Sequence, residues 1–209
     1  AEILEAAPES ATALAAGEVV QRRTYRLAFV TDPSYAAYFG SANVLAAKTT
    51  LVNRVNQVYN DDLAIRFVLI DGTDELNLDT VELATGAGGP CGQNGCYSEA
   101  DLAPDSGCTG SLLTRTEFVL GQIVGADSFD IGHIGLGVNG GGVAGLGVVG
   151  GASKASGCTG LSTPKGDFYA VDYVAHEIGH QMGGNHTFDG TQANCSTLNR
   201  SGATSVEPG

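Results

Sequence analysis

Three of the four histidines in the chain lie within one short segment, HEIGHQMGGNH, at residues 176–186. On a helix, His176 and His180 are one turn apart, so both rings project from the same face at about 5–6 Å. This spacing suits two nitrogen ligands of a tetrahedral zinc ion. Gly183 can take the left-handed conformation that ends a helix, which lets the chain turn back and bring His186 in as a third ligand. The pattern predicts a three-histidine zinc site with one position open to water.

Glu177 follows the first predicted ligand and can reach a water on the metal without being a ligand itself. Zinc lowers the pKa of such a water to about 7, and Glu177 is then expected to take its proton and pass it to the leaving amine of a cleaved peptide. The extended spacing HExxHxxGxxH is more specific than HExxH alone. The alternatives are a helix with incidental histidines and a non-catalytic zinc site, in which Glu177 would have no purpose.

Two further polar residues, His133 and Asp172, could also belong to this site. His133 lies in a strand-like run and is expected to be packed or hydrogen-bonded there, so we do not assign it to zinc. Asp172 precedes the motif on the same predicted helix. It is either an orienting partner of the site or a solvated acid favoured by the helix dipole.

Two strand-like runs flank a helical stretch in the first third of the chain. Tyr25–Thr31 (YRLAFVT) is predicted to be a strand because it is rich in β-formers. An Asp-Pro-Ser helix start follows at 32–34, and residues 34–60 carry apolar side chains at helical spacing. Ala64–Ile70 (AIRFVLI) is predicted to be a second strand. This βαβ order predicts that the two strands are parallel.

The second half alternates in the same way. Residues 111–124 regain helical spacing, and Ser128–Leu136 is predicted to be a third strand. Gly142–Val149 is predicted to be an edge strand because of its glycines. Phe168–Met182 is predicted to be the helix that carries the histidine motif. This order indicates an α/β or α+β domain around a mixed sheet.

Composition narrows the function classes. Lys and Arg total 10 against 23 Asp and Glu, a formal charge of −13, which argues against a nucleic-acid partner. The acidity is consistent with solubility alone or with surface Ca²⁺ sites built from Asp and Asn oxygens, although no EF-hand loop is present. No apolar run is long enough to span a membrane.

The cysteines indicate the compartment. All five lie in Gly-, Ser- or Asn-rich stretches, which favours disulfides and an oxidising, extracellular setting. Cys91 and Cys96 are close enough to close a small loop within the turn-rich stretch 85–110. Cys108 and Cys158 are the second expected pair, which leaves Cys195. The sequence does not fix this connectivity. A C-x4-C zinc site is the alternative, but it lacks a second matching pair.

Several segments resemble a known family. HEIGHQMGGNH matches the motif of the metzincin zinc peptidases. More of the chain resembles their bacterial reprolysin-like branch, which is related to the adamalysins. The similar stretches cover most of residues 24–209 and are YRLAFV, LAIRFVLIDGTD, FDIGHIG, GGGVAGLGVVG and AVDYVAHEIGHQMGGNHTFDG. The His-Thr-Phe that begins at His186 also resembles the pappalysin branch, which stays a second family.

The resemblance implies an architecture. It implies a metzincin-type catalytic domain over residues 24–209, with 1–23 as an N-terminal segment or the remnant of a pro-segment. The domain would hold a twisted mixed sheet of about five strands with an antiparallel edge strand, long backing helices and an active-site helix.

The resemblance also assigns roles to residues. It carries over one catalytic zinc ion, Glu177 as the general base, and the ligands His176, His180 and His186. It places Gly142–Val149 along the cleft, where the strand would pair with an extended substrate by β-augmentation. The substrate-binding residues implied by this placement are Gly145, Leu146, Gly147 and Val148.

The chain departs from the metzincin pattern in one respect. Metzincins carry a Met-turn downstream of the third histidine, but the only methionine here is Met182, inside the predicted helix. In similar proteins the segment resembling SVEPG runs into the Met-turn and a further cysteine, whereas this sequence stops at Gly209. We therefore expect the remaining C-terminal piece of the catalytic domain to be a partner of this chain and to pair with Cys195.

The main functional prediction is a secreted zinc endopeptidase that hydrolyses peptide bonds of extracellular proteins. The alternative from another class is a zinc-containing structural or adhesion module with an inactive peptidase site. An intracellular zinc hydrolase acting on small substrates is disfavoured by the loop cysteines.

Overall fold

A computed structural model describes residues 20–186 of the chain. Most of the expected N-terminal segment 1–23, the cysteine at 195 and the SVEPG end lie outside the described residues. The expectations for these parts stay predictions.

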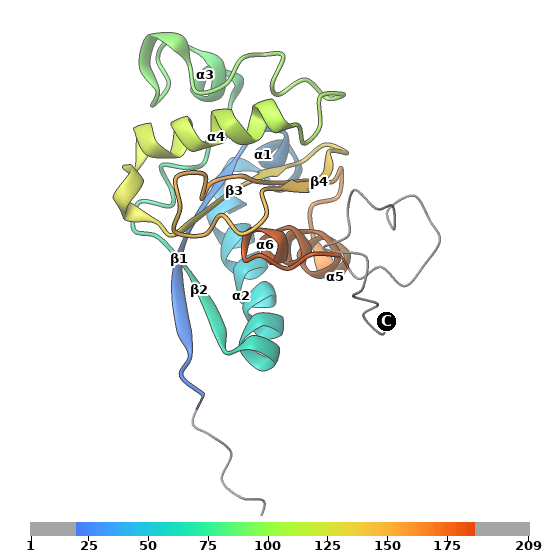
Figure 1. The fold of residues 1–209 in the computed structure, drawn as a ribbon. Coiled ribbons are helices and arrows are strands. Elements are labelled where there is room, and N and C mark those ends of the chain that lie inside the picture. Colours follow the sequence, from blue (N-terminus) through green and yellow to red (C-terminus); the bar gives the residue numbers. More distant parts are fainter. Residues whose placement is uncertain (1–19, 187–209) are drawn as a thin grey trace, which may run out of the picture.

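A five-stranded sheet organises the described part of the chain (Figure 1). Its strand order is β2-β1-β3-β5-β4, and the first four strands in this order are parallel. β4 is antiparallel to β5 at the edge of the sheet, which confirms the expected mixed sheet with an antiparallel edge strand. The strands are β1 (Arg23–Thr31), β2 (Ile65–Leu69), β3 (Ile131–Leu136), β4 (Gly141–Ala144) and β5 (Gly157–Gly160).

Helices cover both faces of this sheet (Figure 1). Successive side chains of β1 point to opposite faces. Ala28 and Val30 therefore pack in the core beneath α4 (Gly110–Ile123). Leu27 and Phe29 pack in the other core, against α2 (Val44–Leu63) and the histidine-bearing helix. The sheet is thus buried on both sides, as expected for parallel strands.

The first helical stretch is interrupted. α1 (Pro33–Phe39) begins as expected, because the Asp32 carboxylate accepts a hydrogen bond from the Tyr35 N–H at 3.0 Å. The prediction of one helix over 34–60 is wrong, since Gly40 takes a positive φ of 78° and ends α1. A short 3₁₀ turn, η1 (Ser41–Asn43), leads into α2. The predicted parallel pairing of β1 with β2 is confirmed.

The connection from β2 to β3 combines turns and short helices with the 14-residue helix α4. It contains α3 (Val81–Thr85), η2 (Gly92–Asn94), α4 and η3 (Ala126–Ser128). α4 confirms the helix predicted over 111–124, and the Thr109 hydroxyl caps it by accepting a hydrogen bond from Leu112 N.

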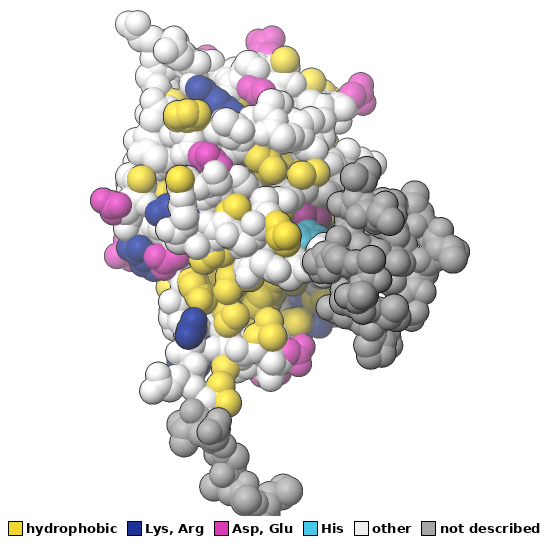
Figure 2. Space-filling view, viewed as in Figure 1, with side chains coloured by type: hydrophobic (Ala, Val, Ile, Leu, Met, Phe, Trp, Pro, Cys, Tyr) yellow, Lys and Arg dark blue, Asp and Glu magenta, His cyan; other side chains and the backbone are white. Residues whose placement is uncertain are grey.

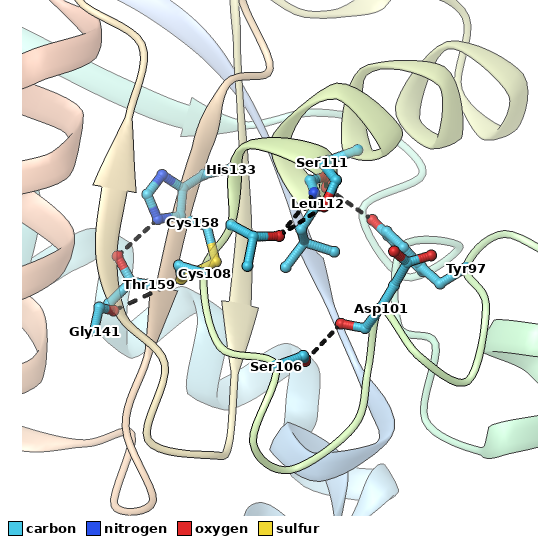
Figure 3. Close-up of a disulfide and its surroundings, with 12 residues drawn as sticks. Tyr97, Asp101, Ser106, Cys108, Ser111, Leu112, His133, Gly141, Cys158 and Thr159 are labelled. Atoms are coloured by element: carbon cyan, nitrogen blue, oxygen red, sulfur yellow. Dashed lines mark hydrogen bonds between the residues drawn. A yellow bond between two sulfur atoms is a disulfide. The ribbon is translucent and has the colours of Figure 1, made fainter.

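Two disulfides constrain this connection, one within it and one to the sheet. Cys91 pairs with Cys96 and Cys108 pairs with Cys158, so both expected pairs are confirmed. The second bond joins the residues just before α4 to strand β5 (Figure 3).

The glycine-rich edge of the sheet differs from the prediction. The edge strand β4 ends at Ala144, whereas a strand over Gly142–Val149 was predicted. After Ala144 the chain leaves the strand and turns toward the histidine-bearing helix. β5 has no strand-like sequence pattern and was not predicted, yet all four of its residues are buried between β3 and β4.

Within residues 20–186, none of the helices is both long and apolar enough to cross a lipid bilayer.

Candidate metal centre

The histidine motif lies on one helical run with a wide turn in its middle. α5 (Gly166–Tyr169), η4 (Ala170–Ala175) and α6 (His176–Gln181) follow one another without a break. This confirms the predicted helix over Phe168–Met182. The six residues of η4 are π-helical, a wider turn that recurs at functional sites. On this run Val174, Ala175 and Ile178 are buried against the sheet, which leaves His176 and His180 at the surface.

Three imidazole nitrogens converge next to α6. The Nε2 atoms of His176 and His180 are 3.1 Å apart, and those of His176 and His186 are also 3.1 Å apart. The Nε2 atoms of His180 and His186 are 3.0 Å apart. Nitrogens at about 2.0–2.1 Å from a tetrahedral zinc ion are spaced by about 3.3 Å, so the triangle has nearly the required size.

The turn after α6 brings in the third histidine as the motif predicted. Gly183 has a φ of 103° and donates its N–H to the His180 carbonyl at 2.9 Å. Gly184 donates to the Gly179 carbonyl at 2.8 Å. These two bonds end the helix and reverse the chain, so that His186 faces His176 and His180.

The protonation of these rings favours metal binding. The Nδ1 of His180 lies 2.7 Å from the Gly184 carbonyl oxygen, which can only accept, so Nδ1 carries the proton and Nε2 keeps a lone pair. Burial lowers the pKa of His176, and the neighbouring His180 and His186 lower it further. Burial and His180 also lower the pKa of His186. Neutral imidazoles with converging lone pairs are the donor set that a metal ion fits.

Glu177 is held beneath the edge strand. Its side chain is buried at 7% exposure, and burial raises its pKa while His180 lowers it. Gly142 of β4 lies directly against it: a Cβ at position 142 would come within 2.7 Å of the Glu177 Cδ and 2.8 Å of its Cγ. The carboxylate is thus confined between the helix that carries the histidines and the edge of the sheet.

The predicted substrate-binding residues Gly145, Leu146, Gly147 and Val148 lie in the turn after β4 rather than within a strand. Gly147 N donates to the His180 carbonyl and Val148 N to the Gln181 carbonyl, both at 2.9 Å. Gly145 N donates to the Ser156 carbonyl at 2.8 Å. Three of the four backbone N–H groups therefore hold the turn against α6 and the sheet. The side chain of Leu146 is 58% exposed, and the role of the four residues in binding substrate stays a prediction.

His133 lies apart from the triad, as expected. It is fully buried on β3, and its two ring nitrogens lie 3.0 Å from Gln181 Oε1 and 2.9 Å from Thr159 Oγ1. Burial lowers the pKa of His133 to about 4, although the hydrogen bond to Gln181 raises it. Asp172 is exposed on the outer side of η4.

Among residues 20–186, the one cluster of three or more metal-ligating side chains is His176, His180 and His186. Figure 2 shows a histidine side chain at the surface, beside an acidic side chain. Two features of the site were not identified from the sequence. Gly142, which the prediction placed along the cleft, lies against Glu177, and the buried Gln181 forms hydrogen bonds to Gly132 and His133. The first had a signal, because a glycine within a predicted strand indicates the close approach of another group.

One family of known proteins matches most of the chain. The sequence model described as "Metallo-peptidase family M12B Reprolysin-like" matches residues 41–209. A search of curated proteins finds no match. A solved structure titled "Structure of a chaperone-substrate complex" is similar over 80% of this chain, with 15% identity and a TM-score of 0.42. The chain spans 24% of the length of that solved chain.

Proposed function

The chain belongs to the reprolysin-like M12B metallopeptidases, and we propose that it is a secreted zinc endopeptidase acting on extracellular proteins and peptides. In this proposal His176, His180 and His186 hold one zinc ion and Glu177 is the general base. The observation that carries the proposal is the convergence of three Nε2 atoms at 3.0–3.1 Å beside the helix turn that carries the buried Glu177 carboxylate.

The histidines and Glu177 have separate roles in this proposed mechanism. A zinc ion held by His176, His180 and His186 would supply Lewis acidity, which polarises the scissile carbonyl and acidifies water. These three residues present neutral nitrogens, one fewer than the four ligands of a structural zinc site, which would leave a position for water. Glu177 accepts the proton of the attacking water and delivers it to the leaving amine, so the peptide bond breaks without a free amide anion.

The position of Glu177 relates the base to the path of the substrate. β4 is the edge strand, and on its outer side an extended peptide can add as a further strand. Because Gly142 of β4 lies against the Glu177 carboxylate, a peptide on this edge would run beside the base. Gly145, Leu146, Gly147 and Val148 would then border the peptide just beyond the strand, with the exposed Leu146 side chain offering an apolar contact.

Secretion is proposed from the two disulfides, since such bonds form and persist in oxidising compartments. Calcium binding at the acidic surface is kept as a lesser proposal. A rise in the unfolding temperature on adding Ca²⁺ to the zinc-loaded protein would support it, and an unchanged temperature would end it.

Casein hydrolysis, measured together with zinc content, tests the main proposal. Glu177→Gln keeps the shape of the side chain but removes the base, so turnover should fall by about 10²–10⁴-fold while one equivalent of zinc stays bound. A chelator should abolish turnover by the wild type. Glu99→Gln is the matched control, because Glu99 is an exposed acid in the disulfide-linked connection. Hydrolysis by Glu177→Gln at the wild-type rate would rule out this assignment of the base.

A further inference from the structure

The last residue of α6, Gln181, occupies a position that the HExxHxxGxxH motif leaves open, yet its side chain is completely buried. A buried primary amide needs partners for its two N–H donors and for its oxygen. Nε2 donates to the Gly132 carbonyl at 2.8 Å and to the Lys154 carbonyl at 3.3 Å. Because both carbonyls can only accept, the amide nitrogen faces them and the amide oxygen faces His133 on the opposite side.

This orientation fixes the tautomer of His133. Gln181 Oε1 can only accept, so the Nδ1 of His133, 3.0 Å away, must carry the proton and donate it. The Nε2 of the neutral ring then accepts from the Thr159 hydroxyl at 2.9 Å (Figure 3). All three side chains are fully buried, and each polar atom of the amide and of the ring has a partner. Such a fully satisfied network specifies one arrangement.

Neighbouring residues pack closely around this network. Phe29 stacks on the His133 ring with centroids 5.6 Å apart and planes 10° apart. On the β5 side, a Cβ at Gly157 would come within 2.6 Å of the Gln181 Cδ, and closer still to its Oε1 and to the His133 Nδ1. The side chains of Gln181 and His133 therefore lie directly on the backbone of β5.

The anchored residue is next to a predicted metal ligand. The carbonyls of His180 and Gln181 accept hydrogen bonds from the N–H groups of Gly147 and Val148. The last turn of α6 is therefore held by its backbone as well as by the Gln181 side chain. From this turn the chain reverses through Gly183 toward His186. A rotation of the last turn of α6 would move His180 and the start of this reversal together, and the three Nε2 atoms would separate.

We propose that Gln181 is a positioning residue for the metal centre, acting with His133 and Thr159 to hold the end of α6 against β3 and β5. The inference rests on the proposed zinc site, since its purpose is to keep the three nitrogens of that site convergent. Gln181 would thus link the histidine motif to the sheet, although the HExxHxxGxxH pattern does not specify the residue at position 181.

The test is zinc affinity, measured by competition with a chromophoric chelator on the full chain. Gln181→Met keeps the length of the side chain and removes the amide, and we expect zinc affinity to fall by about tenfold or more. Thr159→Val removes the far end of the network and should have a smaller effect in the same direction. Tyr97→Phe is the matched control, because it removes a buried hydrogen bond to Thr116 in the core on the other side of the sheet.

Urea unfolding of the metal-free variants separates positioning from general stability. We expect Gln181→Met and Tyr97→Phe both to lower stability, but only Gln181→Met to weaken zinc binding. Equal zinc affinity in these two variants would overturn the inference. If the wild type bound no zinc, the proposed function would fail, and the role of Gln181 would be tested on the metal-free protein. Protection of the Gly183 and Gly184 amides from hydrogen exchange should then fall about tenfold in Gln181→Met, beyond any fall in Tyr97→Phe. Equal protection in the two variants would overturn the inference.

Discussion

A methyl group added at Gly142 should displace the Glu177 carboxylate without unfolding the protein. The new Cβ of Gly142→Ala would lie 2.7 Å from the Glu177 Cδ, whereas ordinary van der Waals contact begins at 3.4 Å. The carboxylate must therefore withdraw by about 0.7 Å or more, and misplacing a catalytic group by about 1 Å can cost about 10²-fold in rate. The clash also reaches the Cγ of this buried side chain, so stability should fall by about 1–3 kcal/mol, as for other overpacked sites.

The assay compares kcat for casein or peptide cleavage, zinc content and urea unfolding in the wild type and Gly142→Ala. We expect kcat to fall by about two orders of magnitude with one equivalent of zinc retained. The control is Gly121→Ala in α4, where an added Cβ meets no atom within 4 Å. This control should keep full activity and gain up to about 1 kcal/mol of stability, because Ala is the better helix former. A wild-type kcat in zinc-loaded Gly142→Ala would mean that the catalytic base does not lie beneath β4.

Three further outcomes follow from the structure. The pKa of buried His133 is about 4 in the folded chain against about 6.5 when unfolded. Its contribution to the free energy of unfolding should therefore be largest above pH 6.5, fall by about 3 kcal/mol toward pH 4 and then level off. Urea unfolding measured over this pH range would show the fall. Replacing Cys108 and Cys158 by Ser opens a link across a sequence separation of 50 residues and should cost about 4 kcal/mol, measured by thermal unfolding; a loss below 1 kcal/mol would contradict this. Asp32→Ala removes the cap of α1 and should destabilise by about 1–2 kcal/mol with zinc affinity unchanged.

Much of the fold could be predicted because its signals are local. The strands β1 and β2 carry dense β-formers, and an Asp-Pro-Ser start marks the helix between them. The disulfide pairs were expected from loop composition and spacing, and both formed as expected. For the strands and the helix start, a few neighbouring residues determine the outcome. The Cys108–Cys158 pair instead joins residues 50 apart, and the sequence alone did not fix that pairing.

The predictions that were wrong or absent concern features that depend on distant partners or on a single backbone angle. Helical spacing runs through Gly40, and only its positive φ separates α1 from α2. The sequence of β5 is GCTG, which is typical of a turn, and it is a strand because β3 and β4 lie on either side of it. Likewise, β4 ends at Ala144 because the backbone beyond it bonds to Ser156 and to the end of α6.

The candidate site divides in the same way. The spacing of the three histidines predicted which side chains would converge, since helix geometry and one glycine turn determine it. Gln181 could not be identified, because its partners His133 and Gly132 are 48 and 49 residues away in the sequence. Neither the motif nor the helical periodicity contains information about those contacts.

X-ray absorption at the zinc edge of the zinc-loaded full chain identifies the ligands of the metal. We expect three imidazole nitrogens and one light oxygen ligand at about 2.0–2.1 Å, and two imidazoles in His186→Ala. Sulfur ligands at about 2.3 Å, or an unchanged number of imidazoles in His186→Ala, would contradict the three-histidine centre.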